Sequence, residues 1–166
     1  MVPLRPTTVR NQLLTSLPPE GGHMEQSSDK WDGSLGLRGL RVLVAEDEAI
    51  IALVLEAALH DLGCVVLPAV PSVEAALTML RAERPDIALL DLELADGSAA
   101  PVADTLAGMG VPFAVMTGHG RSTIADPLMR TAPYLGKPYG PEELRAALMA
   151  LARLAAPPRY PMRSVA

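Results

Sequence analysis

The chain is poor in aromatic residues and has a single cysteine. Its 166 residues include one Trp, three Tyr and one Phe, so the core must be built from Ala, Leu, Val, Ile and Met. The lone Cys64 excludes an internal disulfide and fits a reducing compartment. Basic residues are also scarce: 14 Lys plus Arg stand against 19 Asp plus Glu, a net charge of −5. A nucleic-acid binder that coats phosphates normally shows the opposite balance.

A long apolar run is missing as well. No apolar run is longer than that from Ala49 to Leu55, which stops at Glu56 and is far shorter than a membrane span. The first residues carry no basic segment followed by an apolar stretch, so no secretory signal is expected. Hydrophobic residues make up 49% of the chain and charged residues 20%, which is ordinary globular composition. We therefore expect a soluble, cytoplasmic, acidic domain.

The two ends of the chain differ in composition from the middle. Residues 1–37 are rich in Pro, Gly and polar residues and predict a mobile N-terminal extension, within which Met24 is an alternative start. Residues 38–156 are expected to form the folded domain. The prolines of residues 157–166 cannot continue a helix and predict a short C-terminal tail.

Between the ends, short apolar runs alternate with segments of helical spacing. Strands are predicted at Leu40–Ala45, Cys64–Leu67, Ile87–Leu90, Pro112–Met116 and Tyr134–Leu135. Helices are predicted at Glu48–Leu62, Val73–Glu83, Pro101–Ala107 and Pro141–Leu154. A further helix over residues 120–130 is disfavoured by Pro127 in its interior. This alternation predicts an α/β fold, a doubly wound five-stranded parallel sheet of order 2-1-3-4-5.

In such a sheet, ligands bind beyond the carboxyl ends of the strands, near the point where strand order reverses. Glu46 and Asp47 follow the first predicted strand, and Asp91 follows the third. Thr117 follows the fourth strand and Lys137 the fifth. Three carboxylates should therefore face a hydroxyl and an ammonium across one crevice.

Clustered carboxylates repel one another unless a cation lies among them, and Mg²⁺ suits an acidic pocket with one open side. An aspartate beside such an ion can attack a phosphoryl group and form an acyl phosphate. Taken singly, each residue also has an ordinary structural explanation: Asp47 as a helix cap, Asp91 and Thr117 as turn residues, Lys137 as a surface lysine. Cys64 fits buried packing better than chemistry.

Four segments together resemble a bacterial response-regulator receiver domain, over residues 40 to about 155. They are Val42–Glu48, Ala88–Leu92, Met116–Gly118 and Lys137–Tyr139. The resemblance implies a flavodoxin-like fold in which Asp91 is the phosphoacceptor. It further implies that Mg²⁺ is held by Glu46, Asp47, Asp91 and the backbone carbonyl of Glu93. Thr117 and Tyr134 would then be switch residues, and Lys137 would bind the phosphoryl group. The peptide bond before Pro138 is implied to be cis.

A narrower resemblance concerns Pro101–Asp104 followed by Val111–Gly120, which together are similar to the single-domain alphaproteobacterial receivers called FATGUY. Two residues depart from that group: His119 stands where tyrosine is usual, and Tyr134 where an aromatic is often missing. The group is associated with phosphorelays of the general stress response. Only twelve residues follow Leu154, too few for an output domain, so output through protein contacts is expected.

The expected partners are a sensor histidine kinase or histidine phosphotransfer protein and a downstream signalling protein, with no DNA or membrane, and a monomer or weak dimer is expected. No enzymatic turnover beyond slow autodephosphorylation is expected. Two alternatives stay open: a magnesium-dependent phosphatase of the haloacid-dehalogenase type and a phosphorylation-independent interaction module. The phosphatase normally needs Asp-x-Asp after the first strand, where this chain has Glu46-Asp47.

The first predicted helix is apolar on more than one side. Its core face is predicted from the helical spacing of Ile51, Val54, Leu55, Ala58, Leu59 and Leu62. That leaves Ile50, Leu53 and Ala57 on a second stripe, where a helix facing water should be polar. We interpret this stripe as a kinase docking surface, with cover by the last helix or by the N-terminal extension as the alternative.

Overall fold

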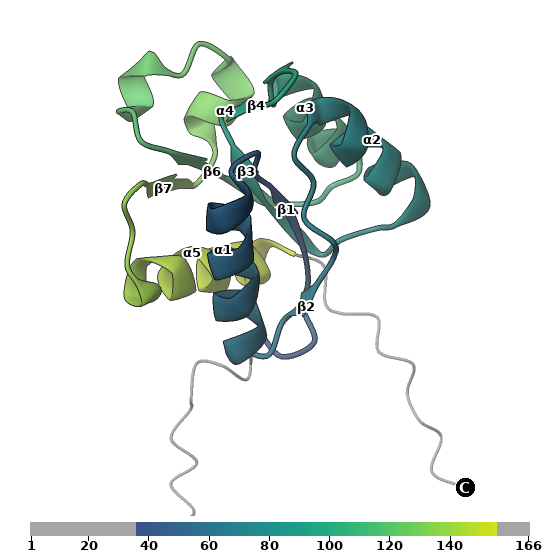
Figure 1. Cartoon of the computed structure of the whole chain (residues 1–166), viewed down its shortest axis with the longest axis vertical. Coiled ribbons are helices and arrows are strands. Elements are labelled where there is room, and N and C mark those ends of the chain that lie inside the picture. Colours follow the sequence, from purple (N-terminus) through teal and green to yellow (C-terminus); the bar gives the residue numbers. More distant parts are fainter. Residues whose placement is uncertain (1–35, 156–166) are drawn as a thin grey trace, which may run out of the picture. The chain divides into compact units, whose positions relative to one another are not determined.

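The structure is a computed structural model that describes residues 36–155. A five-stranded parallel sheet of order β2-β1-β3-β6-β7 runs through it, with helices on both faces (Figure 1). The strands are β1 (Arg41–Ala45), β2 (Val65–Val66), β3 (Ile87–Asp91), β6 (Phe113–Thr117) and β7 (Tyr134–Gly136). Counted within this sheet alone, the order is the predicted 2-1-3-4-5, and the predicted fold class is confirmed.

The helices divide between the two faces of the sheet. They are α1 (Ala49–Asp61), α2 (Val73–Ala82), α3 (Ala100–Gly108), α4 (Pro127–Thr131) and α5 (Pro141–Leu154). Residues of α2, α3 and α4 pack on one face of the sheet, and those of α1 and α5 pack on the other. No helix within residues 36–155 is long and apolar enough to cross a membrane.

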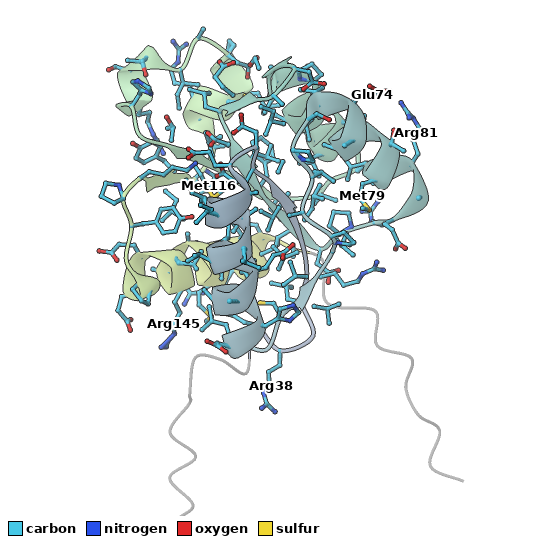
Figure 2. The ribbon with its side chains drawn as sticks, in the orientation of Figure 1. Arg38, Glu74, Met79, Arg81, Met116 and Arg145 are labelled. Atoms are coloured by element: carbon cyan, nitrogen blue, oxygen red, sulfur yellow. The ribbon has the colours of Figure 1, made fainter. Side chains whose placement is uncertain are left out.

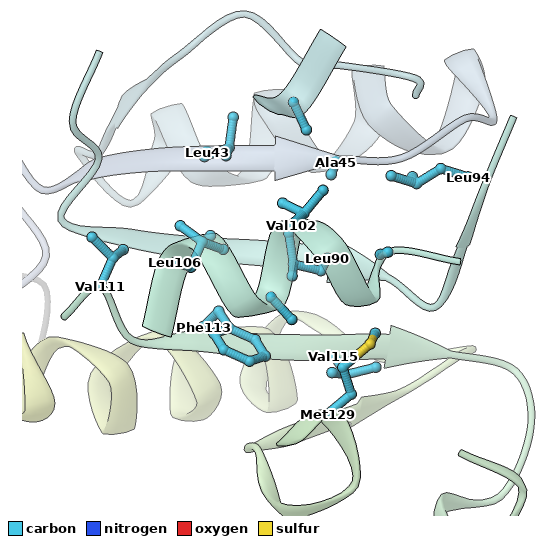
Figure 3. Packing of buried hydrophobic residues seen from close by; sticks show 14 of the residues in the cluster. Leu43, Ala45, Leu90, Leu94, Val102, Leu106, Val111, Phe113, Val115 and Met129 are labelled. Atoms are coloured by element: carbon cyan, nitrogen blue, oxygen red, sulfur yellow. The ribbon is translucent and has the colours of Figure 1, made fainter. Parts of the chain in front are cut away.

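Each central strand serves both cores because successive side chains point to opposite faces. In β1, Leu43 and Ala45 join the cluster under α2 and α3, while Val42 and Val44 join the cluster under α1 and α5. Figure 3 shows the first cluster from close by, where the single Phe113 lies among aliphatic side chains. The aliphatic core expected from the composition is confirmed for the described residues.

The predicted domain boundaries fall largely on residues that the structure does not describe. Most of the predicted extension 1–37, including Met24, and all of the predicted tail 157–166 lie outside the described residues. Leu37, however, is fully buried in the core cluster that holds α1 and α5. Figure 2 shows the contrast between buried and exposed side chains: Met116 lies inside the fold, whereas Glu74 and Arg81 point outward from α2.

Local signals explain where the helices begin and end. The predicted stop at Gly63 is confirmed, since α1 ends at Asp61 and Gly63 takes a φ of +82°, a conformation that favours glycine. Pro127 does not lie inside a helix but opens the five-residue α4, whose Met129 N–H donates to the Asp126 side chain at 2.8 Å. The region expected to be a poor helix is thus a 3-10 turn, Arg121–Thr123, followed by α4.

A small hairpin follows Asp91, and no sequence pattern predicts it. Strands β4 (Glu93–Leu94) and β5 (Gly97–Ser98) pair antiparallel and form a separate two-stranded sheet. Each strand has two residues, too short for any periodicity to reveal it. The hairpin belongs to the loop that leads from the third strand of the main sheet into α3.

The predicted core face of α1 is wrong at one position. Val54 is 65% exposed, whereas Ala52, which was not included, is only 8% exposed. The buried stripe is Ala52, Leu55 and Leu59, at spacings of three and four residues. Because α1 is apolar on nearly every side, the spacing of its large residues alone could not choose between neighbouring registers.

Candidate functional site

The carboxyl ends of β1 and β3 bring three carboxylates together, as predicted. One oxygen from each of Glu46, Asp47 and Asp91 lies within 4.8 Å of the others. Glu46 is only 2% exposed, Asp91 is partly buried and Asp47 is exposed, so the cluster is buried on one side and open on the other. Three like charges this close favour a bound cation.

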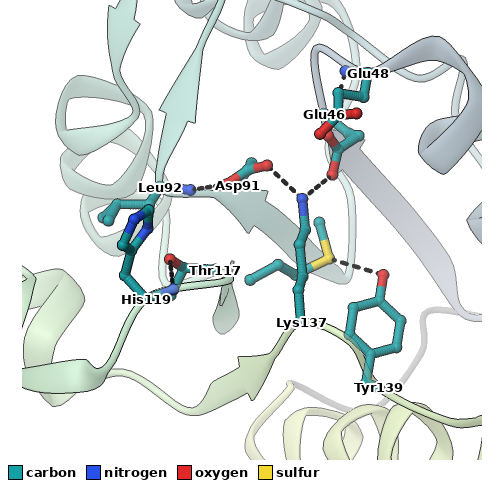
Figure 4. A network of polar contacts seen from close by, with 9 residues as sticks. Glu46, Glu48, Asp91, Leu92, Thr117, His119, Lys137 and Tyr139 are labelled. Atoms are coloured by element: carbon teal, nitrogen blue, oxygen red, sulfur yellow. Dashed lines mark hydrogen bonds and ion pairs between the residues drawn. The ribbon is translucent and has the colours of Figure 1, made fainter.

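Lys137 reaches into this cluster from the loop after β7 (Figure 4). Its Nζ donates to Glu46 Oε2 at 2.6 Å and to Asp91 Oδ2 at 2.5 Å. The other oxygen of Asp91, Oδ1, accepts from the Leu92 N–H at 2.6 Å, which fixes the orientation of the carboxylate. The Lys137–Pro138 peptide bond is cis, as the resemblance implies.

Burial and charge act on the protonation of both partners. Burial raises the pKa of Glu46 above its ordinary value and the nearby Asp91 adds to this, although the hydrogen bond from Lys137 opposes it. For Lys137, burial alone would lower the pKa, but the hydrogen bonds to Asp91 and Glu46 raise it above its ordinary value. The ammonium of Lys137 therefore stays charged at neutral pH.

The residues of the cluster fit a hard divalent cation. Three carboxylates against one ammonium leave an excess of negative charge, and all the side-chain donors are oxygens of the kind that Mg²⁺ prefers. The exposed Asp47 leaves room for water ligands on the open side. Glu93 begins β4 two residues after Asp91, so its backbone belongs to the same loop as the central carboxylate.

Thr117 and Tyr134 are both bound to the backbone of His119. Thr117, 2% exposed, accepts from the His119 N–H at 3.0 Å through Oγ1. The Tyr134 hydroxyl donates to the His119 carbonyl oxygen at 2.8 Å, and the Arg121 guanidinium lies 5.7 Å from the Tyr134 ring centre. The two hydrogen bonds of the His119 backbone could not be predicted from the sequence, because every residue type except proline has the same backbone N–H and carbonyl groups.

The predicted docking stripe on α1 is exposed. Ile50 is 80% exposed and Leu53 66%, and Ala57 is exposed too. Val54 joins them, so the four residues Ile50, Leu53, Val54 and Ala57 are called the apolar α1 surface below. Helix α5 shares the core on the buried side of α1, and the apolar α1 surface remains exposed. The alternative cover, the N-terminal extension, lies outside the described residues.

The fold and this site together define the class. Residues 42–149 match the family model of the response regulator receiver domain. The chain belongs to the response-regulator receiver family.

Within that family, the chain is similar to regulators of the PhyR type. It is 31% identical to the phyllosphere-induced regulator PhyR of Methylorubrum extorquens over 110 residues, 64% of this chain and 41% of that protein. The response regulator PhyR from Brucella abortus superposes with a TM-score of 0.63 at 25% identity, over 73% of this chain and 51% of that one. The chain thus spans about half the length of these relatives or less.

A third similarity concerns the fold alone. The receiver domain of the sensor histidine kinase PA1611 from Pseudomonas aeruginosa, solved with a magnesium ion coordinated in its active-site cleft, gives a TM-score of 0.62 at 24% identity. The match covers 69% of this chain and 98% of that domain. Receiver domains bind Mg²⁺ at an acidic site, and the cluster of Glu46, Asp47 and Asp91 lies where such a site is expected.

Proposed function

We propose that this protein accepts a phosphoryl group on Asp91, in a Mg²⁺-dependent reaction, and passes the signal on through protein contacts. The observation that carries the proposal is the placement of Lys137 Nζ between Asp91 and Glu46, beside a third carboxylate. A lysine on the surface or an aspartate in a turn would not produce this arrangement. Turnover as an enzyme is not part of the proposal.

The chemistry follows from the residues in place. A carboxylate oxygen of Asp91 attacks the phosphorus of a phosphohistidine, the phosphorus–nitrogen bond breaks, and the imidazole leaves with its electron pair. Glu46, Asp47, Asp91 and the Glu93 backbone carbonyl would hold Mg²⁺, and the bound ion would supply positive charge for the phosphoryl oxygens. Lys137 moves its ammonium from the Asp91 carboxylate to a phosphoryl oxygen and so retains a negative partner.

Thr117 and Tyr134 convert the modification into a change of shape. The Thr117 hydroxyl now accepts from His119, so its own hydrogen is free to be donated to a phosphoryl oxygen. Movement of Thr117 toward the phosphoryl group pulls on the loop at His119. Tyr134 follows because its hydroxyl is bound to the carbonyl of that residue.

The apolar α1 surface is proposed as the docking site for a sensor histidine kinase or a histidine phosphotransfer protein. Its first residue, Ile50, comes three positions after Asp47, so the surface lies beside the acidic cluster. A helical bundle seated there would present its histidine to Asp91. Two solved PhyR structures that resemble this chain are described as a stress response regulator and as an anti-anti-sigma factor. The similarity to PhyR therefore supports a cytoplasmic phosphorelay of the general stress response with a downstream signalling protein.

Labelling by a small phosphoryl donor tests the proposal. Incubation with acetyl phosphate and Mg²⁺ should add one acid-stable, base-labile phosphoryl group, measured by intact mass. Asp91→Asn should abolish it, while Asp104→Asn, a matched loss of charge at an exposed position of α3, should not. Equal labelling of Asp91→Asn would disprove the assignment. Steady release of phosphate from a generic phosphomonoester would favour the phosphatase alternative instead.

A further inference from the structure

The β4–β5 hairpin that follows Asp91 is attached to the start of α2 by three hydrogen bonds. The carboxylate of Asp96, in the turn of the hairpin, accepts from the Val73 N–H at 2.6 Å and from the Glu74 N–H at 3.1 Å. The neighbouring Ala95 N–H donates to the Pro71 carbonyl oxygen at 3.0 Å. The partners lie more than twenty positions apart in the sequence, so the contacts cross between two segments of the fold.

These bonds complete the first turn of α2. The first N–H groups of any helix have no partner within the helix and must find acceptors elsewhere. Here the first two, of Val73 and Glu74, both go to Asp96, and the third, of Ala75, goes to Ser72 Oγ at 3.1 Å. A negative charge at this end of a helix is also favourable. The pKa of Asp96 is lowered by the hydrogen bonds from Val73 and Glu74, consistent with a carboxylate that accepts both.

The segment that receives the hairpin is also bonded to the other half of the acidic site. The Glu46 N–H donates to the Val70 carbonyl oxygen at 3.0 Å, one residue before Pro71. The short segment from Val70 to Glu74 thus touches the backbone of Glu46 on one side and Ala95 and Asp96 on the other. It connects the end of β1 with the loop that carries Asp91 and Glu93.

We propose that Asp96 is a positioning residue of the magnesium and phosphoacceptor site. By holding the hairpin against α2, it fixes the loop after Asp91 relative to the carboxylates of Glu46 and Asp47. The inference rests on the proposed function, because it concerns the same site. It assigns a role to a residue that does not itself belong to the acidic cluster.

An aspartate suits this role better than its close analogues. Its two oxygens can accept from two backbone N–H groups at once, whereas the asparagine amide offers a single acceptor oxygen. Asp96→Asn should therefore keep one of the two bonds, and Asp96→Ala should lose both. The two variants form a graded series, and Asp104→Ala removes an exposed charge on α3 as a matched control.

Magnesium affinity is the deciding measurement. Residues that orient metal ligands from outside the ligand set change affinity by about 10-fold or more when they are replaced. Mg²⁺ titration, followed by the amide NMR signals of Glu46, Asp47 and Asp91, should give an increase of about 10-fold in Kd for Asp96→Ala, a smaller increase for Asp96→Asn, and no change for Asp104→Ala.

The outcomes separate this inference from the proposed function. Faster amide exchange at Val73 and Glu74 in Asp96→Ala, with an unchanged Kd for Mg²⁺, would overturn the positioning role and leave the proposed function standing. If Asp96→Ala does not fold, Asp96→Asn decides in the same way. A wild-type protein that neither binds Mg²⁺ nor accepts a phosphoryl group would instead overturn the proposed function.

Discussion

The hydroxyl of Tyr134 donates to the backbone carbonyl oxygen of His119 at 2.8 Å. The N–H of the same His119 donates to Thr117 Oγ1 at 3.0 Å. The backbone of one residue therefore connects Thr117, at the carboxyl end of β6, with the aromatic ring of Tyr134 at the edge of the sheet. Displacement of either side chain must displace the loop between them or break one of the two bonds.

Tyr134→Phe removes only the donor of this pair. A hydrogen bond of this kind is worth about 0.5–1.5 kcal/mol, so we expect amide exchange to accelerate roughly 3- to 10-fold at residues 118–120. Exchange in the core strands should not change. The control is Tyr139→Phe, since the Tyr139 hydroxyl donates to the weak acceptor Met116 Sδ at 3.6 Å. Unchanged exchange at residues 118–120 in Tyr134→Phe would show that the bond does not hold the loop.

Gly136→Ala tests the same contact from the other side of the ring. A Cβ at this position would lie 3.0 Å from both Cε1 and the hydroxyl oxygen of Tyr134, a tighter approach than most Cβ contacts in proteins. The ring is expected to shift and lengthen its hydrogen bond to His119, so amide exchange at residues 118–120 should accelerate in the same direction as in Tyr134→Phe, without loss of the hydroxyl. Gly108→Ala is the control, because a Cβ there meets no atom within 4 Å. A normal exchange pattern in Gly136→Ala would mean that the ring keeps its bond to His119.

Leu53→Asp tests the apolar α1 surface. An apolar residue in a small interface contributes roughly 1–3 kcal/mol, so transfer from the cognate kinase should slow about 10-fold or more. Labelling by acetyl phosphate should stay normal, and the fold should survive because Leu53 is 66% exposed. Leu154→Asp, at a position of α5 with the same 66% exposure, should leave kinase transfer unchanged. Normal kinase transfer to Leu53→Asp would remove this surface from the docking model.

Cys64 should make stability depend on alkaline pH. Burial raises the pKa of its thiol from 9.0 to about 11. Above pH 9 the unfolded chain loses this proton while the folded protein keeps it, so the contribution of the neutral thiol is complete below pH 9 and disappears as pH rises toward 11. Its full size is roughly 2–3 kcal/mol, since one pKa unit corresponds to about 1.4 kcal/mol.

Urea unfolding of the wild type and of Cys64→Ala between pH 8 and 11 provides the measurement. The difference in free energy of unfolding between the two proteins should shrink by that amount across the interval from pH 9 to 11. Cys64→Ala also leaves a small cavity, but its cost is the same at every pH and cancels from the slope. A constant difference would show that the thiol ionises equally easily in both states.

The main sheet was predictable because its central strands are continuous apolar runs that end in polar residues. Leu40–Ala45 and Ile87–Leu90 match β1 and β3 closely, and the strand order then follows from the preferences of parallel sheets. The same reasoning predicted that Lys137 lies near the acidic residues that end two other strands, and its ammonium contacts Glu46 and Asp91. Positions fixed by topology are accessible to such reasoning.

Positions that depend on contacts between distant loops could not be predicted from the sequence. In the sequence, Asp96 is typical of an ordinary turn residue next to Gly97. Nothing in the neighbouring residues indicates that its carboxylate accepts from the first N–H groups of a helix more than twenty positions away. The exposure of Val54 was missed for another reason. A small residue, Ala52, shares the buried stripe with Leu55 and Leu59, and hydrophobic spacing gives little weight to alanine.

The shortness of α4 sets the speed at which this part of the fold can rearrange. Five residues, held by the Asp126 cap and the buried Met129, contain only a few backbone hydrogen bonds that must break before the segment adopts another conformation. Helical segments of about 20 residues already relax within roughly 0.1–1 µs. If Asp91 accepts a phosphoryl group as proposed, the segment between β6 and β7 would rearrange soon after transfer, and the transfer to Asp91, rather than the folding of α4, would set how quickly the signal appears.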